Sequence, residues 1–226
     1  MSRRFTLSLS IAGAVLLMAM PAGAHSGHTS SFSVTNANTN AYPNFSYSQT
    51  FGANEPTTVV IEFEAGWKFA HAPGYGSEIT PTPTAGEQIG SGSYTAAWTL
   101  FFCATSTSNL TIYWDTSMTG APMGAVAHWR IEMATGVTAP IWVIEQNDAT
   151  DDYKLVIPWP YGATCSTQPA NHGFSMTVNG TTASGGHPFQ NPSASGCYDV
   201  NGSHVDTALV NHAGATHTVA VGGATC

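Results

Sequence analysis

The sequence predicts an all-β fold in which antiparallel sheets pack face to face. The first observation is a series of short runs rich in valine, isoleucine, threonine and aromatic residues, a composition typical of β-strands. The second is that glycine, proline, asparagine and aspartate cluster between these runs, where turns require them. The third is that almost no stretch has the period of an amphipathic helix. Together these features favour strands and turns throughout.

Eleven runs of this kind follow one another along the chain. In chain order they are 31–36, 44–51, 57–64, 94–102, 109–115, 126–133, 140–146, 153–159, 173–180, 204–211 and 216–223. The runs between residues 57 and 159 carry the strongest pattern, and the others are weaker. Such regular spacing indicates two packed sheets, in the manner of an immunoglobulin-like or jelly-roll-like β-sandwich.

Alternation within the runs predicts which side chains face the core. In the run 126–133, a period of two places Trp129 and Met133 inward and leaves His128 and Arg130 outward. The run 57–64 alternates in the same way. We therefore expect most tryptophans of the chain to be core residues rather than a sugar-binding platform.

The first 24 residues predict a secretory signal peptide. Arg3 and Arg4 form a positive start, Leu7–Met20 is apolar, and Pro21–Ala24 offers the small residues of a cleavage site. The apolar run is shorter than the roughly 20 residues that span a bilayer. We therefore expect a secreted, extracellular protein with no membrane span.

Residues 25–226 are expected to form a single β-sandwich domain. A shift in composition near residue 165 leaves a second interpretation open, with an aromatic-rich unit followed by a smaller unit rich in glycine, serine, threonine and histidine. No long charged linker separates the two.

The charge balance excludes polyanionic partners. Without residues 1–24 the chain keeps three cations, Lys68, Arg130 and Lys154, against all 13 acidic residues, which gives 3 − 13 = −10. Such a chain repels a phosphate backbone. Nucleic acids and anionic membrane surfaces are therefore poor partners.

Four cysteines, Cys103, Cys165, Cys197 and Cys226, predict disulfide bonds in an exported protein. Three pairings are possible. We favour Cys103 with Cys165 and Cys197 with Cys226, because each pair would join segments that look like neighbouring strands and connections. No CxxC spacing supports a zinc site instead.

Three segments resemble a known type of domain. They are TTVVIEFEAGWKFAHAPGYG (57–76), GEQIGSGSYTA (86–96) and YKLVIPWPYGATC (153–165), and they are similar to immunoglobulin-like β-sandwich units of secreted bacterial surface proteins. The resemblance implies a binding or structural role outside the cell. It carries over no catalytic residue.

The N-terminus left by signal cleavage would begin with His25, followed by His28. An N-terminal histidine offers an α-amine and an imidazole, and one further imidazole completes a nitrogen site suited to Cu(II). This position resembles the histidine brace of lytic polysaccharide monooxygenases and of periplasmic copper-binding β-sandwich proteins. His71 and His128 are candidates for the third nitrogen, and His25 with His28 alone could also bind Cu(II) as a flexible peptide does.

The other polar candidates have weaker patterns. Five histidines near the C-terminus could form a metal cluster or be solvated: His172, His187, His204, His212 and His217. Acidic candidates for catalysis or Ca²⁺ binding are Glu62, Glu64, Glu132, Glu145, Asp148, Asp151 and Asp152. No nucleophile motif and no phosphate-binding loop occurs in the sequence.

Two functions therefore remain open. The first is a secreted, non-enzymatic β-sandwich that binds a cell surface, a glycan or a protein. The alternative is a copper-binding protein or polysaccharide monooxygenase-like enzyme that uses His25. Copper affinity that requires an unextended N-terminus would distinguish them.

Overall fold

The computed structural model describes residues 28–35, 38–51, 56–99, 103–146, 151–160, 172–192, 200–206 and 216–220. The predicted signal peptide and His25 lie outside these residues. For β12, β13, the first residues of β1, β6 and β9, and the last three residues of β5, all defined below, only the backbone is described.

Thirteen strands and no helix make up the described part of the chain, which confirms the all-β prediction. They are β1 (His28–Val34), β2 (Phe45–Phe51), β3 (Pro56–Glu64), β4 (Lys68–Phe69), β5 (Gln88–Thr99), β6 (Cys103–Asp115), β7 (Ala125–Met133), β8 (Thr138–Glu145), β9 (Asp151–Pro158), β10 (Gly173–Val178), β11 (Phe189–Gln190), β12 (Val200–Asp206) and β13 (Thr216–Ala220). Within the described ranges, no helix is long and apolar enough to cross a membrane.

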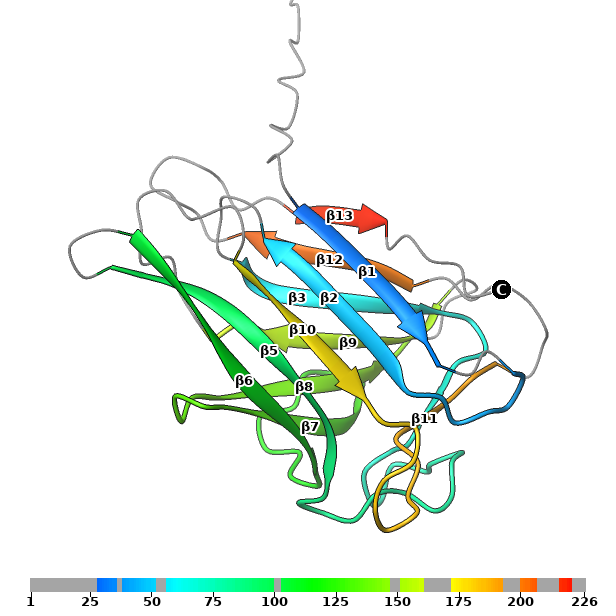
Figure 1. Cartoon of the computed structure of the whole chain (residues 1–226). Helices are drawn as coiled ribbons and strands as arrows, with labels where there is room; N and C mark the ends of the chain where they lie inside the picture. Colours follow the sequence, from blue (N-terminus) through cyan, green and yellow to red (C-terminus); the bar gives the residue numbers. More distant parts are fainter. Residues whose placement is uncertain are drawn as a thin grey trace, which may run out of the picture.

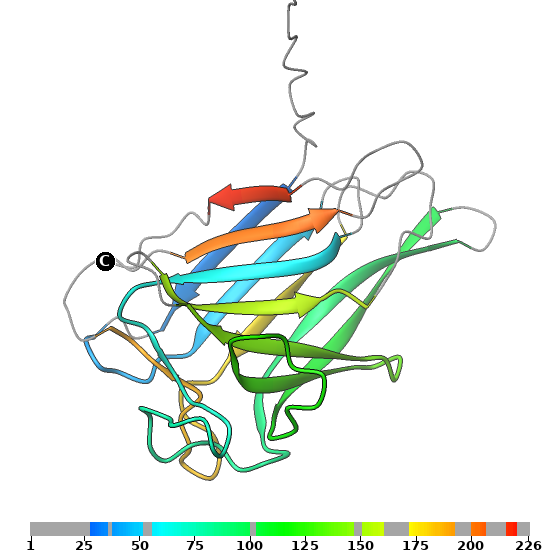
Figure 2. The ribbon, with the colours of Figure 1, turned by 180° about the vertical axis from the view of Figure 1, so that it is seen from behind.

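Eleven of the strands form one antiparallel sheet in the order β1-β2-β10-β5-β6-β7-β8-β9-β3-β12-β13. The sheet curls so that its two halves face each other (Figures 1 and 2). We call β1, β2, β10, β5 and β6 the front layer and the remaining six strands the back layer. The curl brings the two edge strands, β1 and β13, into contact.

The corner between the layers lies at β6. Its C-terminal half, from Leu110 to Asp115, pairs with β7, whereas the residues before it pair only with β5. A small two-stranded sheet of β4 and β11 lies below the layers.

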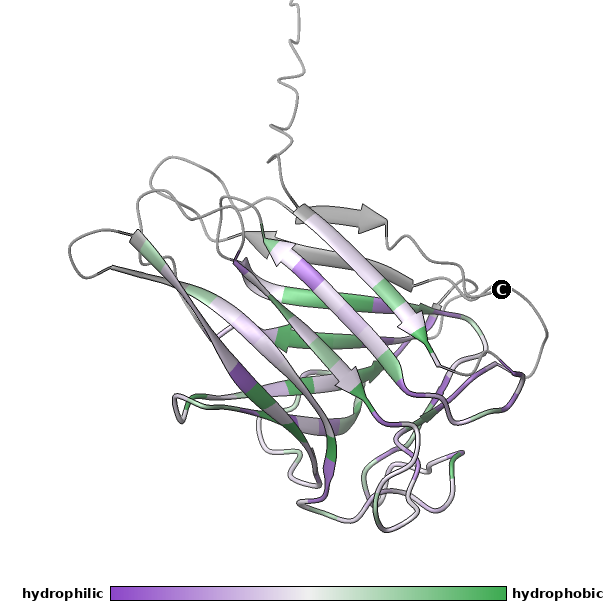
Figure 3. Ribbon diagram, viewed as in Figure 1, coloured by the Kyte–Doolittle hydropathy of each residue, from purple (hydrophilic) through white to green (hydrophobic). Residues whose placement is uncertain are grey.

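Aromatic side chains fill the space between the layers. The ring of Phe63 in β3 lies 5.9 Å from that of Phe45 in β2, and Phe51 lies 4.9 Å from Trp159. The hydrophobic colour of Figure 3 falls largely on strand positions, in alternation with polar ones. Five of the six tryptophans have described side chains and all five are buried: Trp67, Trp114, Trp129 and Trp159 in this core, and Trp142 in a smaller cluster with Ala125 and Ile144.

Several strands differ in their bounds from the predicted runs: β6 begins at Cys103, six residues before the predicted start, and β1 begins at His28, three residues before it. β5 begins at Gln88, six residues before the predicted start, because Gly90 and Gly92 dilute its apolar pattern. β12 covers 200–206 rather than 204–211, and β4 and β11 have only two residues each, too few for a periodic pattern. Strands from both sides of residue 165 belong to the main sheet, and the proposed sub-boundary itself stays a prediction.

Glu87, which immediately precedes β5, joins the loop before β5 to the loop after β10. Its carboxylate accepts hydrogen bonds from the Ser184 amide and hydroxyl, both at 2.7 Å, and from the Thr84 amide at 3.0 Å. Burial alone would raise the pKa of Glu87, but these donors favour the charged form and lower the pKa to about 2.

We expect this loop contact to be lost in acid. Because the folded pKa is below the value of about 4.3 expected in the unfolded chain, the stabilisation is complete above that pH and is lost as the pH falls toward 2. The urea concentration at the midpoint of unfolding should therefore fall more steeply for the parent than for Glu87→Gln as the pH is lowered from 5 to 2.5. Equal slopes would contradict the assignment.

Candidate functional site

The outward side of the front layer is covered by hydroxyl groups. Three rows of residues run across its five strands, and we call these 15 positions the hydroxyl face. The rows are Thr29–Thr50–Gly173–Thr95–Thr107, Ser31–Ser48–Ser175–Ser93–Asn109 and Ser33–Ser46–Thr177–Ser91–Thr111. Thirteen of the positions are serine or threonine and none is charged.

Strand geometry makes this face a regular array. Neighbouring strands are about 4.8 Å apart and alternate residues on one strand are about 6.7 Å apart. Hydroxyl groups on adjacent strands bond to one another: Ser31 to Ser48 at 2.7 Å, Ser46 to Thr177 at 2.8 Å, Ser93 to Ser175 at 3.0 Å and Thr95 to Thr107 at 2.8 Å. Because a hydroxyl has one donor and two acceptor sites, each group in such a pair still has hydrogen-bonding capacity.

The face has a hollow near its centre. Gly173 has no side chain, and the hydroxyls of Thr50 and Thr95 flank it in the same row. A cavity of about 180 Å³ opens there, lined also by Ser48, Ser93 and Ser175. This is smaller than the roughly 300–1,000 Å³ of sites for drug-sized ligands.

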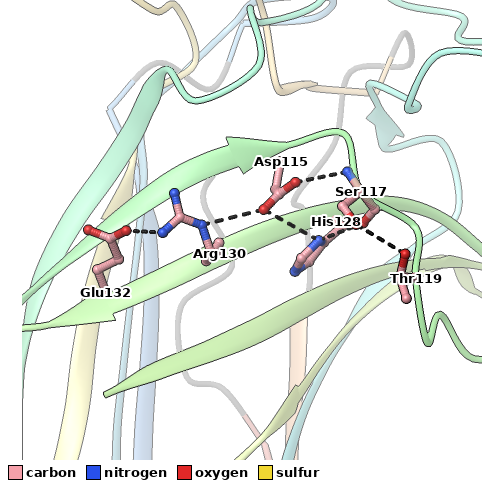
Figure 4. Close-up of polar contacts among 6 residues, drawn as sticks. All are labelled: Asp115, Ser117, Thr119, His128, Arg130 and Glu132. Atoms are coloured by element: carbon pink, nitrogen blue, oxygen red, sulfur yellow. Dashed lines mark hydrogen bonds and ion pairs between the residues drawn. The ribbon is translucent and has the colours of Figure 1, made fainter. Parts of the chain in front are cut away.

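The outward side of the back layer is different, because it carries charges. At the corner, Asp115, His128, Arg130 and Glu132 form a line of contacts with Ser117 (Figure 4). Arg130 contacts both carboxylates: its Nε lies 3.4 Å from Asp115 Oδ2, and its terminal nitrogen bonds to Glu132. Its guanidinium carbon also lies 5.3 Å from the centre of the ring of Tyr113.

This charged line borders a cavity of about 240 Å³, lined by Arg130, His128, Pro140, Trp142 and neighbouring residues. Two acidic partners already neutralise Arg130, and Trp142 is 7% exposed, so the cavity offers neither a free cation nor an open aromatic surface. We interpret this patch as a structural contact that holds the loop after β6 against the sheet.

His128 shows how tightly that loop is attached. Its Nδ1 donates to the Ser117 carbonyl oxygen at 2.8 Å, and its ring stacks on Trp142 with centroids 4.4 Å apart. Its Nε2 is buried and has no hydrogen-bond partner within the described residues. The outward position of His128 agrees with its predicted face.

The structure does not bring His128 close to His28. His28 is the first residue of β1, one register position beyond the row that ends at Thr107, whereas His128 pairs with Asp115. On β6 the register position of His28 is 106, so 115 − 106 = 9 residues separate the two positions, or about 30 Å at 3.3 Å per residue. His25 lies outside the described residues, so the predicted copper site as a whole stays a prediction.

His71 is held by two hydrogen bonds. Its Nδ1 lies 3.0 Å from the Tyr75 carbonyl oxygen, and its Nε2 lies 3.0 Å from the Tyr153 hydroxyl. Burial raises the pKa of Tyr153, and the nearby carboxylates Glu145 and Glu78 raise it further. Both ring nitrogens of His71 are therefore occupied in this fold.

Two of the predicted acidic candidates, Glu145 and Asp152, line one cavity of about 210 Å³ together with Glu78 and Lys68, and the other described candidates lie elsewhere. Glu62 and Glu64 lie on the outward side of β3, Glu132 bonds to Arg130, and Asp152 accepts a hydrogen bond from the Gly66 amide at 2.6 Å. No group of three or more histidine, cysteine or acidic side chains suited to a metal occurs among the residues that were described. Asp148 lies outside those residues, and only the backbone of Asp151 is described.

The predicted disulfides are not tested. Cys103 is the first residue of β6, and Cys165, Cys197 and Cys226 lie outside the described residues. Both favoured pairings stay predictions.

No protein-family model matches the chain, and no curated protein or solved structure matches it either.

Proposed function

We propose that the protein is a secreted, non-enzymatic β-sandwich that binds a neutral polysaccharide through the hydroxyl face. The observation that supports this most directly is the array itself: 15 aligned positions on five strands without a charged residue, with a hollow at Gly173. An uncharged, hydroxyl-rich surface matches a ligand that is itself uncharged and rich in hydroxyl groups.

The choice of a polymer follows from the energetics of hydrogen bonding. A single hydrogen bond that replaces bonds to water contributes only about 0.5–1.5 kcal/mol. A free monosaccharide in the 180 Å³ hollow would therefore bind weakly. An extended chain that contacts several rows at once gains from the effective concentration of its linked units.

The charges of the chain favour a neutral ligand over a charged one. The hydroxyl face has no cation to pair with an acidic sugar, and the chain has an excess of acidic residues. The hollow and the twist that sheets ordinarily have suit a flexible chain better than a flat crystal plane.

Two further elements belong to this proposal. Export rests on the predicted signal peptide of residues 1–24. The kinship with immunoglobulin-like units of bacterial surface proteins rests on the three quoted segments and is supported by the antiparallel, two-layered sheet.

The test is a binding assay on amorphous, non-crystalline cellulose and chitin, with anionic alginate for comparison. The variant Ser93→Ala/Thr95→Val/Ser175→Ala removes three hydroxyls around the hollow and keeps the shape of the strands. We expect it to bind at least about ten-fold more weakly, since three hydrogen bonds of about 0.5–1.5 kcal/mol are affected.

Thr58→Val is the matched control, because it removes an outward hydroxyl from the back layer. It should bind like the parent. Parent protein that ignores both neutral polysaccharides, or a triple variant that binds as tightly as the parent, would overturn the proposal. Thermal unfolding of each variant shows whether the fold is retained.

A further inference from the structure

The hollow in the hydroxyl face is fixed by the pairing of β10 with β2. A Cβ atom on Gly173 would collide with the carbonyl oxygen of Gln49, a backbone atom of β2 that cannot rotate away. A side chain at position 173 would therefore force the two strands apart. The close pairing of these strands requires glycine here, and the floor of the hollow at this position is bare backbone.

Buried side chains hold this floor in place. Phe174, the next residue of β10, is buried, and its ring lies 5.3 Å from that of Trp159 and 5.8 Å from that of Tyr47. Gln49 is buried as well, and its side-chain oxygen accepts a hydrogen bond from the Tyr47 hydroxyl at 2.9 Å. The hollow is therefore preformed, so little of the free energy of binding would be lost in ordering it.

The rim of the hollow consists of hydroxyl groups that neighbouring strands hold in position. Thr95 bonds outward to Thr107 of β6, and Ser48 bonds outward to Ser31 of β1. Because a hydroxyl has one donor and two acceptor sites, Thr95 and Ser48 can each form a further bond toward the hollow. The residues that line the hollow are all uncharged. It therefore suits one neutral group that carries hydroxyls.

The hollow is short in both directions. Thr50 and Thr95 flank Gly173 in its row, two strand spacings or about 9.6 Å apart. Along β10, Ser175 belongs to the lining, whereas the next outward residue, Thr177, does not. The volume of about 180 Å³ far exceeds the roughly 10–15 Å³ that one water needs, so a single hydroxyl group would not fill it. The space is enough for one sugar unit but not for a length of chain.

An unbranched polysaccharide that lies on the rows does not readily fill such a hollow. To lower one of its units between Thr50 and Thr95, the main chain would have to bend on both sides of that unit. A sugar unit that is linked to the polymer at one point enters without this bend, and the linkage raises its effective concentration at the hollow. A side branch has such a linkage and recurs along the polymer, whereas a chain end occurs once.

We propose that the hollow binds a single neutral sugar unit that branches from the main chain of the polysaccharide, while the main chain lies on the surrounding rows. This inference rests on the proposed function and specifies its ligand as a neutral polysaccharide with one-unit side branches. Thr50, Thr95, Ser48 and Ser175 are the residues that would select the branch.

The experiment compares one polymer with and without its branches. Galactomannan is a neutral polysaccharide with single galactose branches, and an α-galactosidase removes most of these and leaves the main chain intact. We expect the full chain to bind galactomannan at least about five-fold more tightly than the debranched polymer in affinity gel electrophoresis. The reason is that the branch adds two or more hydrogen bonds.

Ser175→Gln tests the hollow itself, because it places a longer polar side chain there. Thr177→Gln is the matched control, since it adds the same side chain at the next outward position of β10, outside the lining. Ser175→Gln should bind the two polymers alike. Thr177→Gln should weaken the binding of both together and keep their ratio. Thermal unfolding shows whether each variant is folded, and the comparison of the two polymers on the parent protein needs no variant.

Equal binding of the two polymers by the parent protein would overturn the inference. The proposed function would still stand if the parent binds amorphous cellulose or chitin, so the two failures are distinguishable. Tighter binding of short unbranched manno-oligosaccharides than of galactomannan would also overturn the inference, because the hollow would then hold a chain end. A Ser175→Gln protein that keeps the parent's preference for galactomannan would show that the branch binds elsewhere.

Discussion

Replacement of Phe63 by alanine is expected to lower the free energy of unfolding by about 3–5 kcal/mol, the usual cost of removing a buried aromatic ring. Phe63 lies on β3 and is fully buried. Its ring lies 6.1 Å from Phe32 and 5.9 Å from Phe45 of the front layer, and 4.9 Å from Phe69. The cavity would therefore open between the layers, where neither layer can easily close it.

Glu62→Ala is the control for this prediction. Glu62 is on the same strand and faces outward, so its replacement should change the free energy of unfolding by less than about 0.5 kcal/mol. Urea unfolding followed by tryptophan fluorescence measures both. A Phe63→Ala protein within 1 kcal/mol of the parent would mean that Phe63 does not join the layers.

Alternation in the sequence was sufficient to predict the buried side of β3 and β7, but β8 has no such alternation, because its residues from Ile141 to Ile144 are all buried. The burial of Trp129 and Met133, on the opposite side of β7 from the partly exposed His128, confirms the period of two. Such prediction works where one face of a strand is buried in the core and the other is exposed to solvent. It fails at β4 and β11, since two residues have no period.

The order of the strands could not be predicted in this way. β10 inserts between β2 and β5, although 131 residues separate Ser46 of β2 from its register partner Thr177 of β10. Period identifies a strand's faces but not its neighbours, because pairing depends on the whole sheet. The contact between β13 and β1, which closes the curled sheet, could not be predicted from the sequence either.

The hydroxyl face was missed for the same reason. Its residues appear in the sequence as alternate serines and threonines in the weaker runs, such as Ser46 and Ser48, and as Ser91 and Ser93 among glycines. Each run alone has the pattern of an ordinary strand with one solvent-exposed face. Only the order β1-β2-β10-β5-β6 aligns them into rows.

Among the histidines, the sequence indicated copper chemistry at His25 but could not choose its partners. His128 and His71 were attractive because aromatic residues surround them, and in the structure those surroundings hold both rings in hydrogen bonds and stacking contacts. The pairing of His204 with His217 depends on a register that local sequence does not determine.

Replacement of Gly92 by alanine tests the packing that supports the hydroxyl face. In an ordinary strand the change from glycine to alanine stabilises by roughly 0.5–1 kcal/mol, because glycine loses more conformational entropy on folding. Here a Cβ atom on Gly92 would collide with the carbonyl oxygen of Ser175 and lie 2.8 Å from the Cα atom of Met176. These atoms belong to the backbone of β10 and cannot rotate away.

We therefore expect Gly92→Ala to destabilise the protein by about 3 kcal/mol, the upper end of the cost of overpacking. Ser91→Ala, one residue away on the outward side of β5, should change stability by less than about 0.5 kcal/mol. The sign of the effect in urea unfolding decides between the two expectations, since a stabilised Gly92→Ala protein would show that β10 and β5 do not approach so closely. β5 and β10 supply two of the five residues in every row, so Gly92→Ala should also weaken binding to a polysaccharide. Ser91→Ala removes one hydroxyl and leaves the spacing of the rows intact.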